Sequence, residues 1–155
     1  TSEQMAEIAI STARVVRLFG FDPKVAFVSH STFGQPLTSR TKHIRKAVDI
    51  LKEKKVDFEF DGDMQPDVAL NAEYEELYPF SKIVGKANIL IMPGQHSAAI
   101  SYKMMKTLGD TKVIGPLLIG FGLPIEIAPL RSSTSEIINL ASIAAYSADV
   151  IDYKK

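Results

Sequence analysis

The stretch from residue 25 to residue 34 constrains the fold of this chain more than any other. It reads V-A-F-V-S-H-S-T-F-G, an apolar run at 25–29 that continues into a polar loop. A short run rich in β-branched and aromatic residues, preceded by Pro23 and followed by a glycine-containing loop, predicts a buried central strand. Open α/β sheets bind ligands at the carboxyl ends of their strands. We therefore expect this loop, with its three hydroxyls and one imidazole, to face a cleft.

Helical periodicity and short apolar runs alternate along the rest of the chain. Apolar residues at helical spacing predict helices at 1–19, 39–54, 97–108 and 131–150. A further helical piece is expected to begin at 68–70 and to end at Pro79. Apolar runs predict strands at 25–29, 58–60, 88–92 and 113–121, the last interrupted by Gly115-Pro116. This alternation predicts the α/β class, as a three-layer α/β/α arrangement. We assign it to one domain, residues 1–155, with 131–150 as its final helix.

The termini and core faces of the helices can also be predicted. Thr1 with Gln4, and Ser133 with Glu136, fit capping boxes, and Ser97 is the expected cap of the third long helix. The expected core face of the first helix comprises Met5, Ile8, Ala9, Thr12, Val15, Val16 and Phe19. That of the second comprises Ile44, Ala47, Val48 and Leu51.

An acidic segment follows the strand predicted at 58–60. Asp61, Asp63 and Asp67 are expected to lie in a loop, where they could suggest a calcium site. The spacing lacks the glutamate that closes an EF-hand loop, so that motif is disfavoured. We expect these carboxylates to cap the next helix instead.

Composition excludes several classes of partner. Eighteen basic and eighteen acidic residues cancel, so no net field attracts nucleic acid or an anionic membrane surface. There is no cysteine, hence no disulfide framework and no thiolate metal site. No apolar run reaches the ~18 residues of a membrane span. These features favour a cytoplasmic protein with neither nucleic-acid nor membrane partners, and the opening on Thr1 suggests a domain of a longer protein.

Two groups of residues could bind an anion. Arg131 precedes the final helix, where free N–H groups and the helix dipole favour negative charge, and Ser132 and Ser133 add donors. The alternative is an Arg131 surface ion pair. The second group comprises Arg40, Lys42, Arg45 and Lys46 near the start of the second helix. These cations are either a solvated face or an anion-collecting rim beside Thr32.

Other motifs are weak or missing. The chain has no complete G-x-G-x-x-G and no Walker loop, so an autonomous dinucleotide or nucleoside-triphosphate site is unsupported. His30, His43 and His96 have no metal-ligand spacing. His30 or His96 could act as a base at the cleft, although a loop histidine is more often a hydrogen-bonding bystander.

An ordered series of motifs resembles the phosphotransacetylase (phosphate acetyl/butyryltransferase) family over nearly the whole chain. The motifs are V-A-F-V-S-H-S-T-F-G, K-A-V-D-I-L, D-G-D-M-Q-P-D-V-A-L, G-K-A-N-I-L-I-M-P, Y-K-M-M, I-G-P-L-L-I-G-F-G-L-P and R-S-S-T-S-E-I-I-N-L-A-S-I-A-A. Each is weak alone, and their order makes the set specific. The resemblance implies the isocitrate/isopropylmalate dehydrogenase-like fold, of which this chain is the C-terminal part. It also places Ser31, Thr32, Gly34 and the Arg131 segment in one active-site region.

The stretch before the last helix separates two branches of the family. True transferases read D-L-S-R-G-C-S-x-E-D-I there, with catalytic and CoA-binding roles for the serine, arginine and aspartate. Here the arginine is kept as Arg131, but the serine falls on Leu130 and the aspartate on Ile137. Neither side chain offers an oxygen for acid–base work. Phe33 stands where transferases commonly have lysine. These departures resemble the C-terminal extension of bacterial NADP-dependent malic enzymes.

Three hypotheses follow from this resemblance. The favoured one is a non-catalytic regulatory and oligomerisation domain, with no catalytic residue, that binds acetyl-CoA as effector through Ser31, Thr32, Gly34, Arg131, Ser132 and Ser133. Its partners would be a second copy of itself and the malic-enzyme catalytic domains of the same chain, which alone would hold NADP and a divalent metal. The second is an active phosphate acetyltransferase, in which Ser132, His30 or His96 replaces the serine. The third is a pure assembly module without ligand.

Overall fold

The protein folds as two compact units. The computed structural model describes residues 1–109, 112–121 and 123–150. The first unit is Thr1–Ser101 and the second is Tyr102–Lys155. The division falls inside helix α4 (Gln95–Leu108). The assignment of one domain to residues 1–155 stays a prediction.

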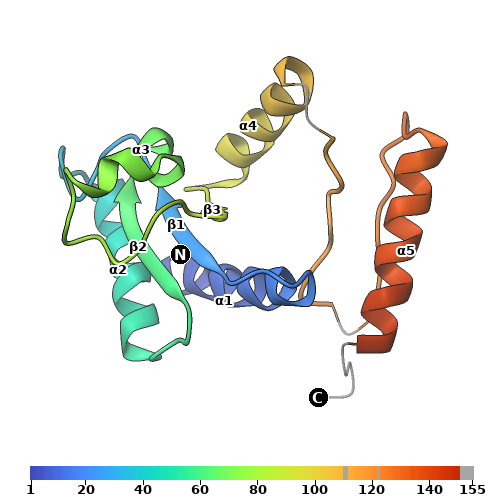
Figure 1. Cartoon of the computed structure of the whole chain (residues 1–155), viewed down its shortest axis with the longest axis horizontal. Coiled ribbons are helices and arrows are strands. Elements are labelled where there is room, and N and C mark those ends of the chain that lie inside the picture. Colours follow the sequence, from blue (N-terminus) through green and yellow to red (C-terminus); the bar gives the residue numbers. More distant parts are fainter. Residues whose placement is uncertain (110–111, 122, 151–155) are drawn as a thin grey trace. The chain divides into compact units, whose positions relative to one another are not determined.

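A three-stranded parallel sheet forms the centre of the first unit (Figure 1). It contains β1 (Lys24–Val28), β2 (Glu59–Met64) and β3 (Ile89–Ile91), in the order β2-β1-β3. Phe27 of the central strand pairs with Gly62 on one side and with Ile91 on the other. The predicted buried central strand is confirmed, displaced by one residue, and the strand predicted at 88–92 is confirmed in its central three residues.

Helices α1 (Ser2–Leu18) and α2 (Ser39–Glu53) cover one face of this sheet. The α2 core face is confirmed, since all four of its predicted residues are buried. The predicted α1 core face is confirmed in part, since Ala9 is buried and Met5 and Val16 pack against the core. The helix buries the small residues Ala6, Ala9 and Ala13, whereas Ile8 is 52% exposed. Alanines let a helix pack closely, because interaxial distance depends on the side chains at the contact.

The other face of the sheet carries a smaller core. It comprises Ala26, Met64, Ala69, Ile83 and Ala87, with Phe33, Val68 and Leu90 packed against it. These residues come from the sheet, from the loop that follows β1, from the short helix α3 (Pro66–Leu70), and from the segment that follows the 3₁₀ helix η1 (Ala72–Glu75). The helical piece predicted to end at Pro79 is thus divided into α3 and η1. Figure 1 shows α3 beginning beside the tip of β2. Cover on both faces of a parallel sheet gives the predicted α/β class.

The acidic segment is not the predicted loop. Asp61 and Asp63 belong to strand β2, and both are buried. They do not cap α3, whose cap position is Gln65 with no side-chain cap bond. The Asp61 carboxylate instead accepts hydrogen bonds from the backbone N–H of Gly62 (2.9 Å) and Lys82 (2.8 Å). Such bonds allow a carboxylate to be buried inside a strand.

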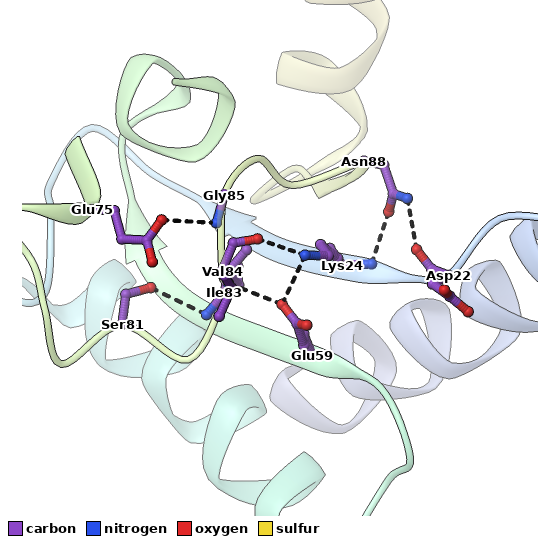
Figure 2. Close-up of polar contacts among 9 residues, drawn as sticks. All are labelled: Asp22, Lys24, Glu59, Glu75, Ser81, Ile83, Val84, Gly85 and Asn88. Carbon is purple, nitrogen blue, oxygen red and sulfur yellow. Dashed lines mark hydrogen bonds and ion pairs between the residues drawn. The ribbon is translucent and has the colours of Figure 1, made fainter. Parts of the chain in front are cut away.

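Polar contacts tie the segment between η1 and β3 to the sheet (Figure 2). The Glu59 carboxylate accepts from the Val84 N–H at 2.9 Å and lies 3.4 Å from the Lys24 ammonium. That ammonium donates to the Val84 carbonyl at 2.6 Å. The Asn88 side chain accepts from the Lys24 N–H and donates to the Asp22 carbonyl, both at 2.8 Å. Side chains at the amino end of the sheet therefore fix the path of this segment.

The second unit contains the second half of α4 and helix α5 (Thr134–Val150). The strand predicted at 113–121 is wrong, since only an isolated antiparallel bridge joins Leu117 to Glu126. Pro116 has no N–H to donate to a ladder, and Gly115 has φ +129°. Helix α4 begins two residues before Ser97, whose hydroxyl donates back to the Gly94 carbonyl at 2.8 Å. None of the helices in the described part of the chain is long and apolar enough to cross a membrane.

Candidate functional site

The loop at residues 29–35, hereafter the β1 loop, lies at the carboxyl end of the sheet, as predicted. The Ser29 N–H donates to the Met64 carbonyl at 2.9 Å, and the Phe33 N–H donates to the Asp63 carbonyl at 2.6 Å. The Gln65 side chain donates to the His30 carbonyl at 2.8 Å. The loop is therefore held against the end of β2 at three points.

Asp63 joins two of the predicted ligand-binding residues. Its Oδ2 atom accepts hydrogen bonds from the Ser31 hydroxyl and from the Gly34 N–H, the latter at 3.2 Å. The Ser31 and Ser29 hydroxyl oxygens lie 3.2 Å apart. Asp63 and Ser31 are both fully buried. Asp63 was not recognised as a site residue from the sequence. The acidic residues around it favoured a loop at this position, whereas Asp63 lies in strand β2, which ends beside the β1 loop.

The hydrogen-bond donors of the β1 loop are of two kinds: those that donate to Asp63, and the Thr32 hydroxyl, which does not. The Ser31 hydroxyl and the Gly34 N–H both donate to Asp63 Oδ2. Thr32 differs, because its Oγ1 accepts from the Gln65 N–H at 3.2 Å and its own hydroxyl proton is used by no bond among the described residues. Among the three predicted contacts of this loop, Ser31, Thr32 and Gly34, Thr32 therefore has the hydroxyl that is free to donate to a ligand.

One cation of the predicted basic rim reaches this loop. The Arg45 guanidinium donates to the Phe33 carbonyl at 3.4 Å. A Cβ atom at Gly34 would lie 2.5 Å from Arg45 Nη1, so the absence of a side chain there lets the guanidinium approach. Lys46 pairs with Glu3 at 3.1 Å instead.

The turn before α5 belongs to the second unit and contains the other predicted ligand residues. The capping box is confirmed: the Ser133 hydroxyl accepts from the Glu136 N–H at 3.3 Å and donates to the Glu136 carboxylate at 3.0 Å. The Ser133 hydroxyl is thus occupied by the cap, and α5 begins at Thr134, three residues after the predicted start. The buried Ser132 hydroxyl has no partner among the described residues. The Arg131 side chain is exposed and shows no ion pair there.

The residues aligned with transferase catalytic groups are exposed hydrocarbon. Leu130, in the serine position, has a relative exposure of 103%, and Ile137, in the aspartate position, is 50% exposed. Ser132 lines a small pocket with Pro129, Asn139 and Leu140. Among the described residues, no group of three or more His, Cys, Asp or Glu side chains could hold a metal ion.

An ion pair reinforces the start of α5. The Lys106 ammonium lies 2.8 Å from the Glu136 carboxylate. Its hydrogen bond, together with those from the Ser133 N–H and hydroxyl, lowers the pKa of Glu136 from 4.5 to about 2. The same hydrogen bond raises the pKa of Lys106. A carboxylate whose pKa is lower in the folded state stabilises that state above its unfolded pKa, and the contribution is lost as pH falls through the folded pKa.

We expect Glu136→Gln to lower the melting temperature at pH 7 and to have a much smaller effect at about pH 2. The wild type should lose this contribution between the unfolded pKa of 4.5 and the folded pKa of about 2. Thermal melts at pH 7, 4 and 2 measure it. Lys106→Met should reproduce most of the loss at pH 7. A difference between wild type and Glu136→Gln that stays constant down to pH 2 would contradict this assignment.

Comparison with known sequences supports the resemblance. The sequence model described as "Phosphate acetyl/butaryl transferase" matches residues 1–145. An NADP-dependent malic enzyme of Rhizobium meliloti is 49% identical over 148 residues, which cover 96% of this chain and 19% of that protein. A phosphate acetyltransferase of Clostridium acetobutylicum is 35% identical, over 96% of this chain and 45% of that protein. The chain thus spans about a fifth of the malic enzymes and under half of the transferases that it matches.

Solved structures agree on the fold. A phosphotransacetylase from Streptococcus pyogenes superposes with a TM-score of 0.90 at 35% identity, covering 96% of this chain and 46% of that one. The EutD phosphotransacetylase from Staphylococcus aureus gives 0.85 at 32% identity, with 95% and 46% covered. The predicted phosphotransacetylase fold is therefore confirmed. With nearly the whole chain matched in sequence and in fold, this chain belongs to the phosphate acetyl/butaryl transferase family.

Proposed function

We propose that this chain is a non-catalytic, phosphotransacetylase-like domain of an NADP-dependent malic enzyme, where it regulates and oligomerises the parent and binds acetyl-CoA as effector. The observation that carries the proposal is Leu130 together with Ile137, since hydrocarbon replaces the serine and the aspartate expected of a working transferase. In the parent, oxidative decarboxylation of malate to pyruvate, with NADP and a divalent metal, would belong to other domains.

The environment of Phe33 supports the loss of catalysis. Transferases commonly have a lysine at this position of the β1 loop, by the resemblance described above. Here the Phe33 ring packs against Tyr78 and Phe80, with ring centroids 5.4 Å and 4.8 Å away. An aromatic ring in such a cluster is held by packing and offers no cation to a phosphate.

An active phosphate acetyltransferase is the second candidate. The relatives of that name and the retained Arg131 favour it. It would transfer an acetyl group between CoA and phosphate, and Ser132, His30 or His96 would have to replace the missing serine.

The purified full-length protein is expected to release no CoA thiol from acetyl-CoA and phosphate beyond the rate of a protein-free control. Loss of a positioned acid or base typically costs ~10²–10⁴ in rate. A thiol-trapping assay, run beside a working phosphate acetyltransferase, measures this. Turnover comparable to that enzyme, and lost on Ser132→Ala or His30→Ala, would establish the second candidate instead.

Arg131→Ala should weaken acetyl-CoA binding by about 1.5–3 kcal/mol, the contribution of a charge-assisted hydrogen bond. The reason is that Arg131 and Ser132 would hold a phosphate or carbonyl group beside the start of α5, while Ser133 keeps its capping role and the melting temperature changes little. Calorimetric titration of the full-length protein with acetyl-CoA tests this, with Arg14→Ala, at an exposed position of α1, as control. Equal affinities of wild type and Arg131→Ala would remove Arg131 from the site.

The surface of the second unit supports self-association. Among its described residues only Leu140 is a buried hydrophobic side chain. Its exposed apolar residues include Met104, Met105, Leu108, Ile114, Leu123, Ile125, Ile127, Leu130 and Ile138. Apolar surface of this extent is typical of an interface. We propose that a second copy covers it, burying roughly 1,200 Å² or more in total. A concentration-independent monomer in sedimentation equilibrium would refute this.

A further inference from the structure

We infer that Asp63 is the positioning residue of the β1 loop: it fixes Ser31 and Gly34 internally and leaves Thr32 as the loop's direct contact with a ligand oxygen. This inference rests on the proposed binding of acetyl-CoA. It changes the roles expected from the sequence, since Ser31 and Gly34 then act through Asp63 rather than by touching the ligand.

The Asp63 carboxylate holds the β1 loop through two hydrogen bonds. Asp63 stands near the end of β2, fully buried, and one of its oxygens receives both the Ser31 hydroxyl and the Gly34 N–H. These two donors bracket Thr32, so a single charged acceptor sets the loop on both sides of that residue. Hydrogen bonds to a charged acceptor are about twice as strong as neutral ones.

The second oxygen of the Asp63 carboxylate differs from the first. Asp63 Oδ1 is buried and has no hydrogen-bond partner among the described residues. A buried, unpaired carboxylate oxygen is costly, and a residue kept only for packing would not need to be charged. Departures from full polar satisfaction are expected where a structure serves function.

The remaining anchors restrict the loop further. The backbone N–H of Phe33 donates to the Asp63 carbonyl, and the Phe33 ring packs on Tyr78 and Phe80. The Gln65 N–H donates to Thr32 Oγ1, which orients this hydroxyl and leaves its proton unused. A ligand carbonyl or phosphate oxygen would accept that proton.

Asp61 provides a matched control two positions earlier on the same strand. It is also a buried aspartate, and it also accepts backbone N–H groups, those of Gly62 and Lys82. None of its bonds reaches the β1 loop. Asp61→Asn therefore removes a similar charge at similar depth without removing any hydrogen bond between Asp63 and the β1 loop.

The experiment uses the full-length protein and two readouts, hydrogen exchange of peptides covering residues 29–35 and calorimetric affinity for acetyl-CoA. Asp63→Asn should speed exchange in those peptides and weaken affinity about tenfold. Ser31→Ala should do the same, and the double variant should be no worse than Asp63→Asn, because both changes remove one interaction. Thr32→Val should weaken affinity without changing exchange. Asp61→Asn should change neither readout.

Several outcomes would overturn the inference. One is unchanged exchange at residues 29–35 in Asp63→Asn, and another is faster exchange without loss of affinity. Additive effects in the double variant, or equal effects of Asp61→Asn and Asp63→Asn, would also overturn it. If wild type does not bind acetyl-CoA, the proposed function fails, and the exchange measurements alone then decide whether Asp63 sets the loop.

Discussion

Gly62→Ala is expected to destabilise the protein by about 2–6 kcal/mol, the sum of a strained backbone and an overpacked core. Gly62 adopts φ +147°, a conformation that residues with a side chain rarely reach. Its added Cβ would lie 2.7 Å from the Phe27 carbonyl oxygen and 2.8 Å from the Phe27 Cβ. Because these atoms belong to the central strand, which is paired on both sides, they cannot move away without disrupting the sheet.

Two other glycines separate the strain from the overpacking. Gly20 has φ +83° but open space around its Cβ position, so Gly20→Ala should cost only the backbone term, about 1 kcal/mol. Gly94 has neither a positive φ nor a close neighbour, so Gly94→Ala should be nearly neutral. Urea unfolding of the three variants gives the comparison. A Gly62→Ala variant as stable as Gly94→Ala would contradict the close contact between β1 and β2.

Phe27→Ala should cost about 3–5 kcal/mol, the usual loss when a buried phenylalanine leaves a cavity. The Phe27 side chain is fully buried in the core between the sheet and helices α1 and α2, among the largest such side chains in the chain. Urea unfolding measures the loss, and Ile8→Ala on the exposed side of α1 should change stability by no more than about 0.5 kcal/mol. Equal losses for Phe27→Ala and Ile8→Ala would mean that the core lies elsewhere.

Phe27→Ala should not rescue Gly62→Ala. The contacts that an alanine at position 62 would make are with the carbonyl oxygen, Cβ and Cα of Phe27, all of which remain when that residue is shortened. The double variant is therefore expected to be less stable than either single one. A double variant as stable as Phe27→Ala alone would place the conflict with the ring instead.

Local patterns were sufficient for much of the first unit. The run at 25–29 predicted the central strand, and the α2 periodicity predicted its four core residues, because an apolar stripe on an otherwise polar helix has one side to bury. Both capping boxes were predicted correctly, since a cap involves residues three positions apart. The order of the motifs was sufficient for the family.

Tertiary contacts decided the rest. Helix α1 has two apolar faces, and its alanines were buried instead of Ile8, a choice that depends on how closely α1 packs rather than on its own sequence. Asp61 and Asp63 can be buried inside β2 because Lys82 and Ser31 donate hydrogen bonds to them. These partners are 21 and 32 residues away along the chain, so local sequence does not reveal them. Periodicity describes only residues along one helix or strand. A segment whose carboxylates are hydrogen-bonded by distant residues is therefore predicted, wrongly, to be a loop. The sequence by itself therefore determined the family, the central strand and the loop that follows it. Only the folded chain, by bringing the distant donors of Ser31 and Gly34 to one buried carboxylate, placed Asp63 beside that loop.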